Sequence, residues 1–272
     1  CKESVWKYKK EWEELTERMG FWLDFENNYI TYETSYIESL WWIIKKFWEK
    51  GLLYEGYKVV PWCSRCGTAL SSHELGQPDV YKTVTDNSVF VRFKILSTNK
   101  EFQNTSILSW TTTPWTLPGN VALAINPNHT FVKIKDPYKE NYFVILEEKS
   151  FERLISEGKI FSKNFGDKKP IKKFKANQIL GLSYEPLFDI PFLKTENSYK
   201  VYSADFVGQE EGTGVVHTAV MYGEEDYELG KKIGLPQKHT VLENAQFIQE
   251  VPAVGGMTIL SLIHISEPTR QA

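Results

Sequence analysis

Three consecutive threonines, Thr111 to Thr113, are the first residues of this 272-residue chain whose type and spacing suit chemistry. Each hydroxyl can both donate and accept a hydrogen bond. The threonines lie in residues 110–120, Trp-Thr-Thr-Thr-Pro-Trp-Thr-Leu-Pro-Gly-Asn, where Pro114 and Pro118 should end a strand. The pattern predicts hydroxyls at a strand end, where a cleft could form. The plainer interpretation is a threonine-rich edge strand that runs into a turn.

A second string, residues 212–227, carries a histidine and a carboxylate nine positions apart. His217 follows two glycines on a predicted strand, and Asp226 opens a predicted helix. An acid there could simply stabilise the helix dipole, and a single histidine on a strand is more often a hydrogen-bonded core residue. A site forms only if both side chains face the threonines. It would then offer a carboxylate to a cationic amine, beside hydroxyls for an ester and a sugar.

A Cys-x-x-Cys pair, Cys63 and Cys66, is followed by Gly67 in a predicted tight turn. Such a pair is half of a tetrahedral zinc site, but no second Cys or His pair follows at a suitable spacing. A redox role would need a βαβ setting, which the sequence does not predict. Three interpretations stay open: a partial or vacant metal knuckle, a structural turn and a redox pair. With Cys1 the cysteines number three, which suits a reducing, cytoplasmic compartment.

The elements that must position these residues change character along the chain. From about residue 75 apolar residues alternate with polar ones, as in a half-buried strand. Two short helices are predicted at 147–157 and 223–233. Strands are predicted at 88–95, 106–111, 121–125, 130–135, 142–146, 171–175, 200–203, 213–218 and 239–242. Many short strands with few helices favour a closed or strongly curved β-rich domain.

Residues 1–60 are predicted to be helical. An apolar stripe runs from Val5 to Met19 at spacings of three and four. A second helix should begin at the box Ser35-x-x-Glu38 and stop at Gly51. Seven of the nine tryptophans lie at or before Trp62. These rings are predicted to be core, the alternative being a face that meets a partner domain.

The composition sets further limits. A hydrophobic content of 42% and an aromatic content of 14% exclude disorder, and no apolar run approaches the ~18 residues of a membrane span. A net charge of −3 and a pI near 6.1 argue against an autonomous nucleic-acid binder. The start, without Met or signal core, is interpreted as that of an internal fragment. The last residues, 259–272, are interpreted as a vector-derived tail.

Taken together, the three strings resemble the isoleucyl-tRNA synthetase family. Residues 63–74 are similar to the segment that leads into the editing insertion of that family. Residues 110–120 resemble its threonine-rich editing peptide, and residues 212–227 its second editing motif. The valine and leucine enzymes carry Thr-Thr-Arg-Pro where this chain has Thr-Thr-Thr-Pro. The resemblance covers roughly residues 1–258. It implies an α+β chain, with a β-barrel-rich editing domain at 71–258 and a helical connector at 1–70.

The resemblance also implies a reaction and its residues. The chain would hydrolyse valine wrongly attached to tRNA(Ile), which a single hydrophobic pocket cannot exclude well enough. Asp226 should anchor the α-ammonium group, and His217 should form a floor that excludes isoleucine. Thr111, Thr112 and Thr113 would hold the terminal adenosine and position water, and Trp115 would wall the adenosine side. Trp110 is a further implied substrate-binding residue. No nucleophile–base pair is evident, so positioned water is favoured over an acyl-enzyme.

The chain also departs from the family. Val220 replaces the more usual proline before Asp226, which puts the shape of that loop in doubt. Both ATP-binding signatures, His-x-Gly-His and Lys-Met-Ser-Lys-Ser, are absent, so the fragment should not activate amino acids. ATP and Mg would act only in the missing catalytic body, and editing itself needs no cofactor.

The implied partners are the 3′ end of tRNA(Ile) and the catalytic body of the same enzyme, with a monomeric fragment and no membrane. Two rivals from other classes stay open. One is a non-catalytic module that docks tRNA or the synthetase. The other is a zinc or redox adaptor built on Cys63 and Cys66.

Overall fold

The computed structural model describes residues 2–83, 87–136, 138–158 and 169–259. The chain divides into two compact units, Cys1–Tyr57 and Lys58–Ala272. The boundary between the two units, after Tyr57, thus lies earlier in the chain than the predicted boundary at residue 70. Ile259 donates its backbone N–H to Ala245 O, and the rest of the predicted tail lies outside the described residues. No helix within the described ranges is long and apolar enough to cross a membrane.

The first unit is helical, as predicted, and consists of α1 (Lys2–Trp6), α2 (Lys9–Arg18) and α3 (Thr34–Glu49). The predicted start of α3 at Ser35 is wrong. The N-cap is Glu33, without a side-chain cap, and the Ser35 carbonyl instead accepts a hydrogen bond from Ser39 Oγ. The predicted stop is confirmed, since Gly51 follows the helix with a φ of +67°.

The prediction that the early tryptophans form a core is wrong for this chain. Neither α2 nor α3 contains a buried residue. All seven rings are exposed, from 36% for Trp6 to 94% for Trp22. So many exposed large apolar side chains on α2 and α3 are typical of a contact surface. The alternative interpretation, a face that meets another part of a larger protein, is therefore favoured.

The second unit opens with a hairpin, β1 (Trp62–Cys63) and β2 (Thr68–Ala69), followed by α4 (Ser72–Leu75). A capping box starts α4: the Ser71 hydroxyl accepts from Glu74 N, and the Glu74 carboxylate accepts from Ser71 N at 2.7 Å. Trp62 Nε1 donates to Glu243 O at 2.8 Å. This bond ties the hairpin to the later part of the unit.

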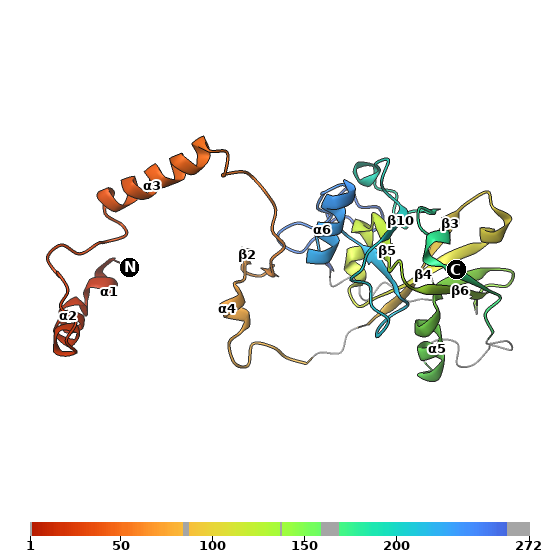
Figure 1. The fold of residues 1–272 in the computed structure, drawn as a ribbon, viewed down its shortest axis with the longest axis horizontal. Helices are drawn as coiled ribbons and strands as arrows, with labels where there is room; N and C mark the ends of the chain where they lie inside the picture. Colours follow the sequence, from red (N-terminus) through yellow and green to blue (C-terminus); the bar gives the residue numbers. More distant parts are fainter. Residues whose placement is uncertain (1, 84–86, 137, 159–168, 260–272) are drawn as a thin grey trace. The chain divides into compact units, whose positions relative to one another are not determined.

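A nine-stranded mixed sheet forms the body of the second unit (Figure 1). Its order is β11-β5-β10-β9-β3-β4-β7-β6-β8, with the pairs β10–β5 and β4–β7 parallel and the others antiparallel. The strands are β3 (Val89–Leu96), β4 (Thr105–Thr111), β5 (Ala122–Ile125), β6 (Thr130–Lys135), β7 (Phe143–Glu147), β8 (Lys172–Lys175), β9 (Ser183–Tyr184), β10 (Lys200–Ser203) and β11 (Val215–Thr218).

The sheet bends back on itself. β11 stands first in the strand order and β4 sixth, yet the two lie against each other: buried Ser109 of β4 donates through Oγ to Val215 O of β11 at 2.8 Å. The predicted α+β class, a large curved sheet with few helices, is confirmed. Of the predicted strands, 239–242 contributes only an isolated bridge between Val241 and Phe247.

Two helices pack on this sheet where the predictions put them. α5 (Glu148–Ser156) buries Phe151 and Leu154 against β6 and β7. α6 (Glu224–Ile233) buries Leu229 beside Ala124 of β5. α5 follows β7 directly, whereas a loop of residues 219–223 joins β11 to α6.

Candidate functional site

The three threonines lie at the end of β4, as predicted. Thr111 is the last residue of the strand and is buried, whereas Thr112 and Thr113 are exposed. Thr113 N donates to Thr111 Oγ1 at 3.1 Å, and the two hydroxyl oxygens lie 3.3 Å apart. Pro114 then begins the 3₁₀ helix η2 (Pro114–Gly119). The turn thus leaves the side chains of Thr112 and Thr113 accessible, while Thr111 braces their backbone.

His217 lies on β11, opposite Leu123 of β5, and is only 7% exposed. Burial lowers the pKa of its imidazole to about 4. The ring is therefore neutral at pH 7 and carries a single N–H. Its Nε2 lies 2.9 Å from Thr116 Oγ1 on η2.

The hydrogen-bond partners of Thr116 define the histidine tautomer. Thr116 Oγ1 donates its one hydrogen to Thr113 O at 2.8 Å, so it can only accept from His217. The proton of the neutral ring then lies on Nε2. Nδ1 is a buried acceptor with no partner among the described residues. In this arrangement the hydroxyl is not deprotonated by the histidine, so the pair does not activate Thr116 as a nucleophile.

Asp226 lies in the first turn of α6 and is half-buried rather than exposed. Burial raises the pKa of its carboxyl group to about 7, although a backbone hydrogen bond from Ala219 N, 3.4 Å from Oδ2, acts in the opposite direction. Val220, the departure from the family pattern, is buried against Gly230, where an added Cβ would lie 2.6 Å from Val220 Cγ2. Close packing of Val220 on α6 thus shapes the loop that leads to Asp226.

The raised pKa of Asp226 predicts a pH-dependent stability. A carboxyl group that titrates at about 7 when folded and at 3.8 when unfolded binds more protons in the folded state. The free energy of unfolding therefore falls as pH rises through this window. Asp226→Asn removes that loss, and we expect it to stabilise the chain by about 1–2 kcal/mol more at pH 8 than at pH 5. Urea unfolding at both pH values measures the difference.

The matched control for this measurement is Glu224→Gln, which neutralises an exposed acid in the same helical turn. Its effect on the free energy of unfolding should be nearly the same at both pH values. An Asp226→Asn effect that does not grow with pH would mean that the carboxylate is well solvated in the folded chain.

One cavity of about 440 Å³ brings the predicted residues together. The three threonines, Trp110, His217 and Asp226 all contribute to its lining. It thus joins the end of β4, the strand β11 and the first turn of α6, which are distant in sequence. Hydroxyls, a neutral imidazole and a carboxyl group whose pKa is about 7 thus line one solvent-accessible cavity. The arrangement can hold a cationic amine beside an ester and a water molecule.

Trp115 does not line this cavity. Its ring packs edge-on against Tyr222, with centroids 5.2 Å apart, and Tyr222 is the lining residue. The phenol oxygen of Tyr222 accepts from Thr240 N at 2.7 Å and from Val241 N at 2.9 Å. Trp115 therefore supports the wall from behind.

Sequence reasoning missed Thr116, Tyr222 and the wall formed by residues 207–214. Thr116 lies three residues after Thr113 in the same string, so its spacing along η2 was a usable signal. The glycines at 212 and 214 were a further signal in the sequence, because glycine is favoured where φ is positive. The structure gives these residues φ values of +63° and +68°. Tyr222 had no signal, because its position depends on the loop between β11 and α6.

Cys63 and Cys66 form the turn between β1 and β2. Cys66 N donates to Cys63 Sγ at 3.4 Å, and Gly67 N to Cys63 O at 2.8 Å. The hydrogen bond from Cys66 N lowers the pKa of the Cys63 thiol. Within the described ranges no group of three or more His, Cys, Asp or Glu side chains could hold a metal ion. The two thiols alone do not make the four-ligand site that structural zinc requires.

We expect the purified chain to bind well under one zinc ion per molecule, because two thiolates leave half of a tetrahedral shell without protein ligands. Atomic absorption after dialysis against a weak chelator measures the content. Cys63→Ser is the control, since it should change this low content little. Stoichiometric zinc that is lost in Cys63→Ser would instead reveal additional ligands.

Comparison with known proteins first gives the class. A family model described as tRNA synthetases class I (I, L, M and V) matches residues 1–117. Among solved structures, the Plasmodium knowlesi cytosolic leucyl-tRNA synthetase editing domain is 13% identical with a TM-score of 0.46, covering 65% of this chain and 90% of that one. The first part of the chain is thus similar to class I tRNA synthetases.

Within that class, the similarity is to isoleucine–tRNA ligases. The Clostridium tetani enzyme is 45% identical over 260 residues, which are 95% of this chain and 23% of the relative. The Thermus thermophilus enzyme is 43% identical over 251 residues, or 92% of this chain and 22% of the relative. The chain is therefore a homologue of one stretch of the isoleucine–tRNA ligases and spans about a quarter of their length.

Proposed function

We propose that this chain is the editing segment of an isoleucine–tRNA ligase and hydrolyses the ester of valine wrongly attached to tRNA(Ile). The observation that carries the proposal is the single cavity shared by the threonines, His217 and Asp226. Residues distant in sequence meet there in the combination that an aminoacyl ester requires. The parent enzyme would use ATP elsewhere to join isoleucine to the tRNA.

The proposed roles follow from the chemistry of each group. The valyl α-ammonium pairs with the Asp226 carboxylate, and a nearby cation favours its ionised form. The exposed hydroxyls of Thr112 and Thr113 hold the terminal ribose and orient a water molecule toward the ester carbonyl. His217, neutral and bonded to Thr116, presents a fixed surface to the amino-acid side chain. Positioning supplies the rate increase, without a covalent intermediate.

The partners proposed for this activity are the 3′ end of tRNA(Ile) and the remainder of the same enzyme. The exposed aromatic side chains of α2 and α3 support contact with further protein. With a net charge of −3, the chain neutralises few phosphates by itself, so most tRNA affinity would come from other parts of the enzyme.

Deacylation of pre-charged Val-tRNA(Ile) by the chain tests the proposal directly. Hydrolysis above the spontaneous rate, with Ile-tRNA(Ile) spared, is the expected result. If Val-tRNA(Ile) binds and protects the chain but is not hydrolysed, the chain is a docking module without chemistry.

A further inference from the structure

Residues 208–214, called here the wall segment, form the part of the cavity lining that has no role in the proposed chemistry. Six of its seven residues line the cavity: Gly208, Glu210, Glu211, Gly212, Thr213 and Gly214. None of them offers a titratable group with a role in the proposed reaction. What the segment supplies is the position of its backbone, which sets how wide the cavity is.

The inner face of the wall segment is closely packed. Gly212 has a φ of +63°, and a Cβ added there would lie 3.0 Å from Cε3 of Trp110, itself a lining residue. Gly214 has a φ of +68°, and its added Cβ would lie 2.2 Å from Cβ of Glu147. The backbone at Gly212 therefore packs against Trp110, and the backbone at Gly214 packs against Glu147 at the start of α5. Neither position has room for a side chain.

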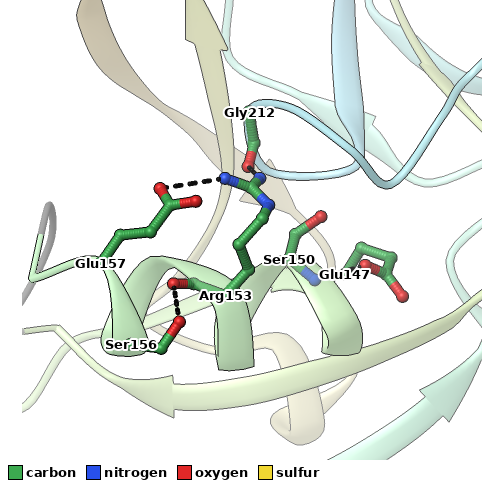
Figure 2. Close-up of polar contacts among 6 residues, drawn as sticks. All are labelled: Glu147, Ser150, Arg153, Ser156, Glu157 and Gly212. Atoms are coloured by element: carbon green, nitrogen blue, oxygen red, sulfur yellow. Dashed lines mark hydrogen bonds and ion pairs between the residues drawn. The ribbon is translucent and has the colours of Figure 1, made fainter.

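The outer face of the segment is bound to α5, as Figure 2 shows for Arg153 and Gly212. Arg153 Nη2 donates to Gly212 O at 2.6 Å. Glu147 N donates to Thr213 O at 2.9 Å, and Gln209 Nε2 donates to Glu147 Oε1 at 3.1 Å. Three hydrogen bonds thus join the wall segment to residues 147–153, which include the end of β7 and the first part of α5.

That stretch is itself rigidly held. The Glu147 side chain is 1% exposed and caps α5 by accepting from Lys149 N and Ser150 N. Phe151 and Leu154 fix the helix on β6 and β7. Arg153 lies between these two residues on the helix, and its Nη1 is 3.4 Å from Glu157 Oε2. Its guanidinium group thus pairs with Glu157 through Nη1 and with Gly212 O through Nη2.

From this geometry we infer that Arg153 is a positioning residue for the cavity: it holds the wall segment at the distance from His217 and Asp226 that a valyl ester requires. The inference rests on the proposed function for its substrate. Arg153 does not line the cavity and touches no reacting atom. It acts through Gly212, whose carbonyl accepts a charge-assisted hydrogen bond from the guanidinium group.

The test compares Arg153→Met, which keeps the apolar stem, with Arg153→Lys, which keeps a charged donor. Ser156→Ala is the matched control, because Ser156 lies on the same helix and bonds only to Arg153 O. Amide hydrogen exchange of residues 208–214 is measured in the full chain of each variant. We expect exchange about tenfold faster in Arg153→Met, partial recovery in Arg153→Lys and no change in Ser156→Ala.

The same variants are then assayed for hydrolysis of Val-tRNA(Ile). Arg153→Met should raise KM about tenfold and change kcat much less, because the wall positions substrate without joining the reaction. A merely destabilising change would lower the active fraction and leave KM unaltered. Unchanged exchange and unchanged KM in Arg153→Met would overturn the inference. If the wild type shows no hydrolysis, the proposed function fails, and the exchange measurement alone decides whether Arg153 holds the wall.

Discussion

Replacing Asp226 by alanine should abolish hydrolysis of Val-tRNA(Ile), lowering kcat/KM by at least about 100-fold, since a charge-assisted hydrogen bond in a partly buried site is lost. Isoleucine activation by an enzyme that contains this chain should be unaffected, because no part of the activation chemistry uses the cavity. Deacylation of pre-charged tRNA and amino-acid-dependent pyrophosphate exchange measure the two reactions separately.

The folded chain should tolerate this substitution. Asp226 is half-buried with a raised pKa, so its carboxylate destabilises the folded state near and above pH 7. Loss of activity in Asp226→Ala therefore cannot be attributed to unfolding if the midpoint of thermal unfolding is unchanged or higher. Glu225→Ala is the control, because Glu225 is exposed and does not line the cavity. Wild-type hydrolysis in Asp226→Ala would remove Asp226 from the site.

The local signals in the sequence predicted where the candidate residues lie in the fold, since each lies beside a strand or helix end. β4 ends at Thr111, Pro114 begins η2 directly after Thr113, and Gly223 precedes the helix that carries Asp226. Such boundaries depend on backbone preferences of a few neighbouring residues. That three such ends meet in one cavity depends on the curvature of the sheet, which brings β11 against β4. A periodic pattern does not encode that curvature.

The features that the sequence did not predict likewise depend on contacts between residues that are distant in the chain. Trp41 and Trp48, seven positions apart, have the helical spacing of a core face, but spacing cannot tell which surface will cover them. The sequence does not indicate that Asp226 is half-buried, because its burial depends on how α6 packs, with Val220 against Gly230. Tyr222 is placed by hydrogen bonds to residues 18 and 19 positions later, a long-range contact without a local signal.

His217 is the residue whose replacement should change specificity rather than remove activity. Its ring is 7% exposed, neutral because burial lowers its pKa to about 4, and fixed by Thr116 at 2.9 Å. A neutral ring carries no positive charge with which to stabilise the ester carbonyl of the substrate. Because it is buried and hydrogen-bonded, moving it aside is also costly. It therefore suits the role of a size-limiting floor better than that of a general acid.

We expect His217→Ala to begin hydrolysing correctly charged Ile-tRNA(Ile), because the extra methyl group of isoleucine no longer collides with the ring. Overpacking a rigid site costs about 1–3 kcal/mol, so the rate with the isoleucyl ester should rise about 5- to 150-fold. Hydrolysis of the valyl ester should fall far less, since Asp226 and the threonines still hold the substrate. Deacylation of both pre-charged tRNAs by wild type and variant measures the change in the ratio.

Thr116→Val separates the volume of the ring from its hydrogen bond. This change removes the partner of His217 Nε2 and keeps the ring in the cavity. If the ring acts as a floor, Thr116→Val should keep most of the discrimination against isoleucine, because the volume that excludes the extra methyl group is still present. If His217→Ala leaves Ile-tRNA(Ile) intact and destroys valyl hydrolysis, the histidine serves catalysis or folding. The surface that excludes isoleucine must then be another part of the lining, such as Tyr222 or the wall segment.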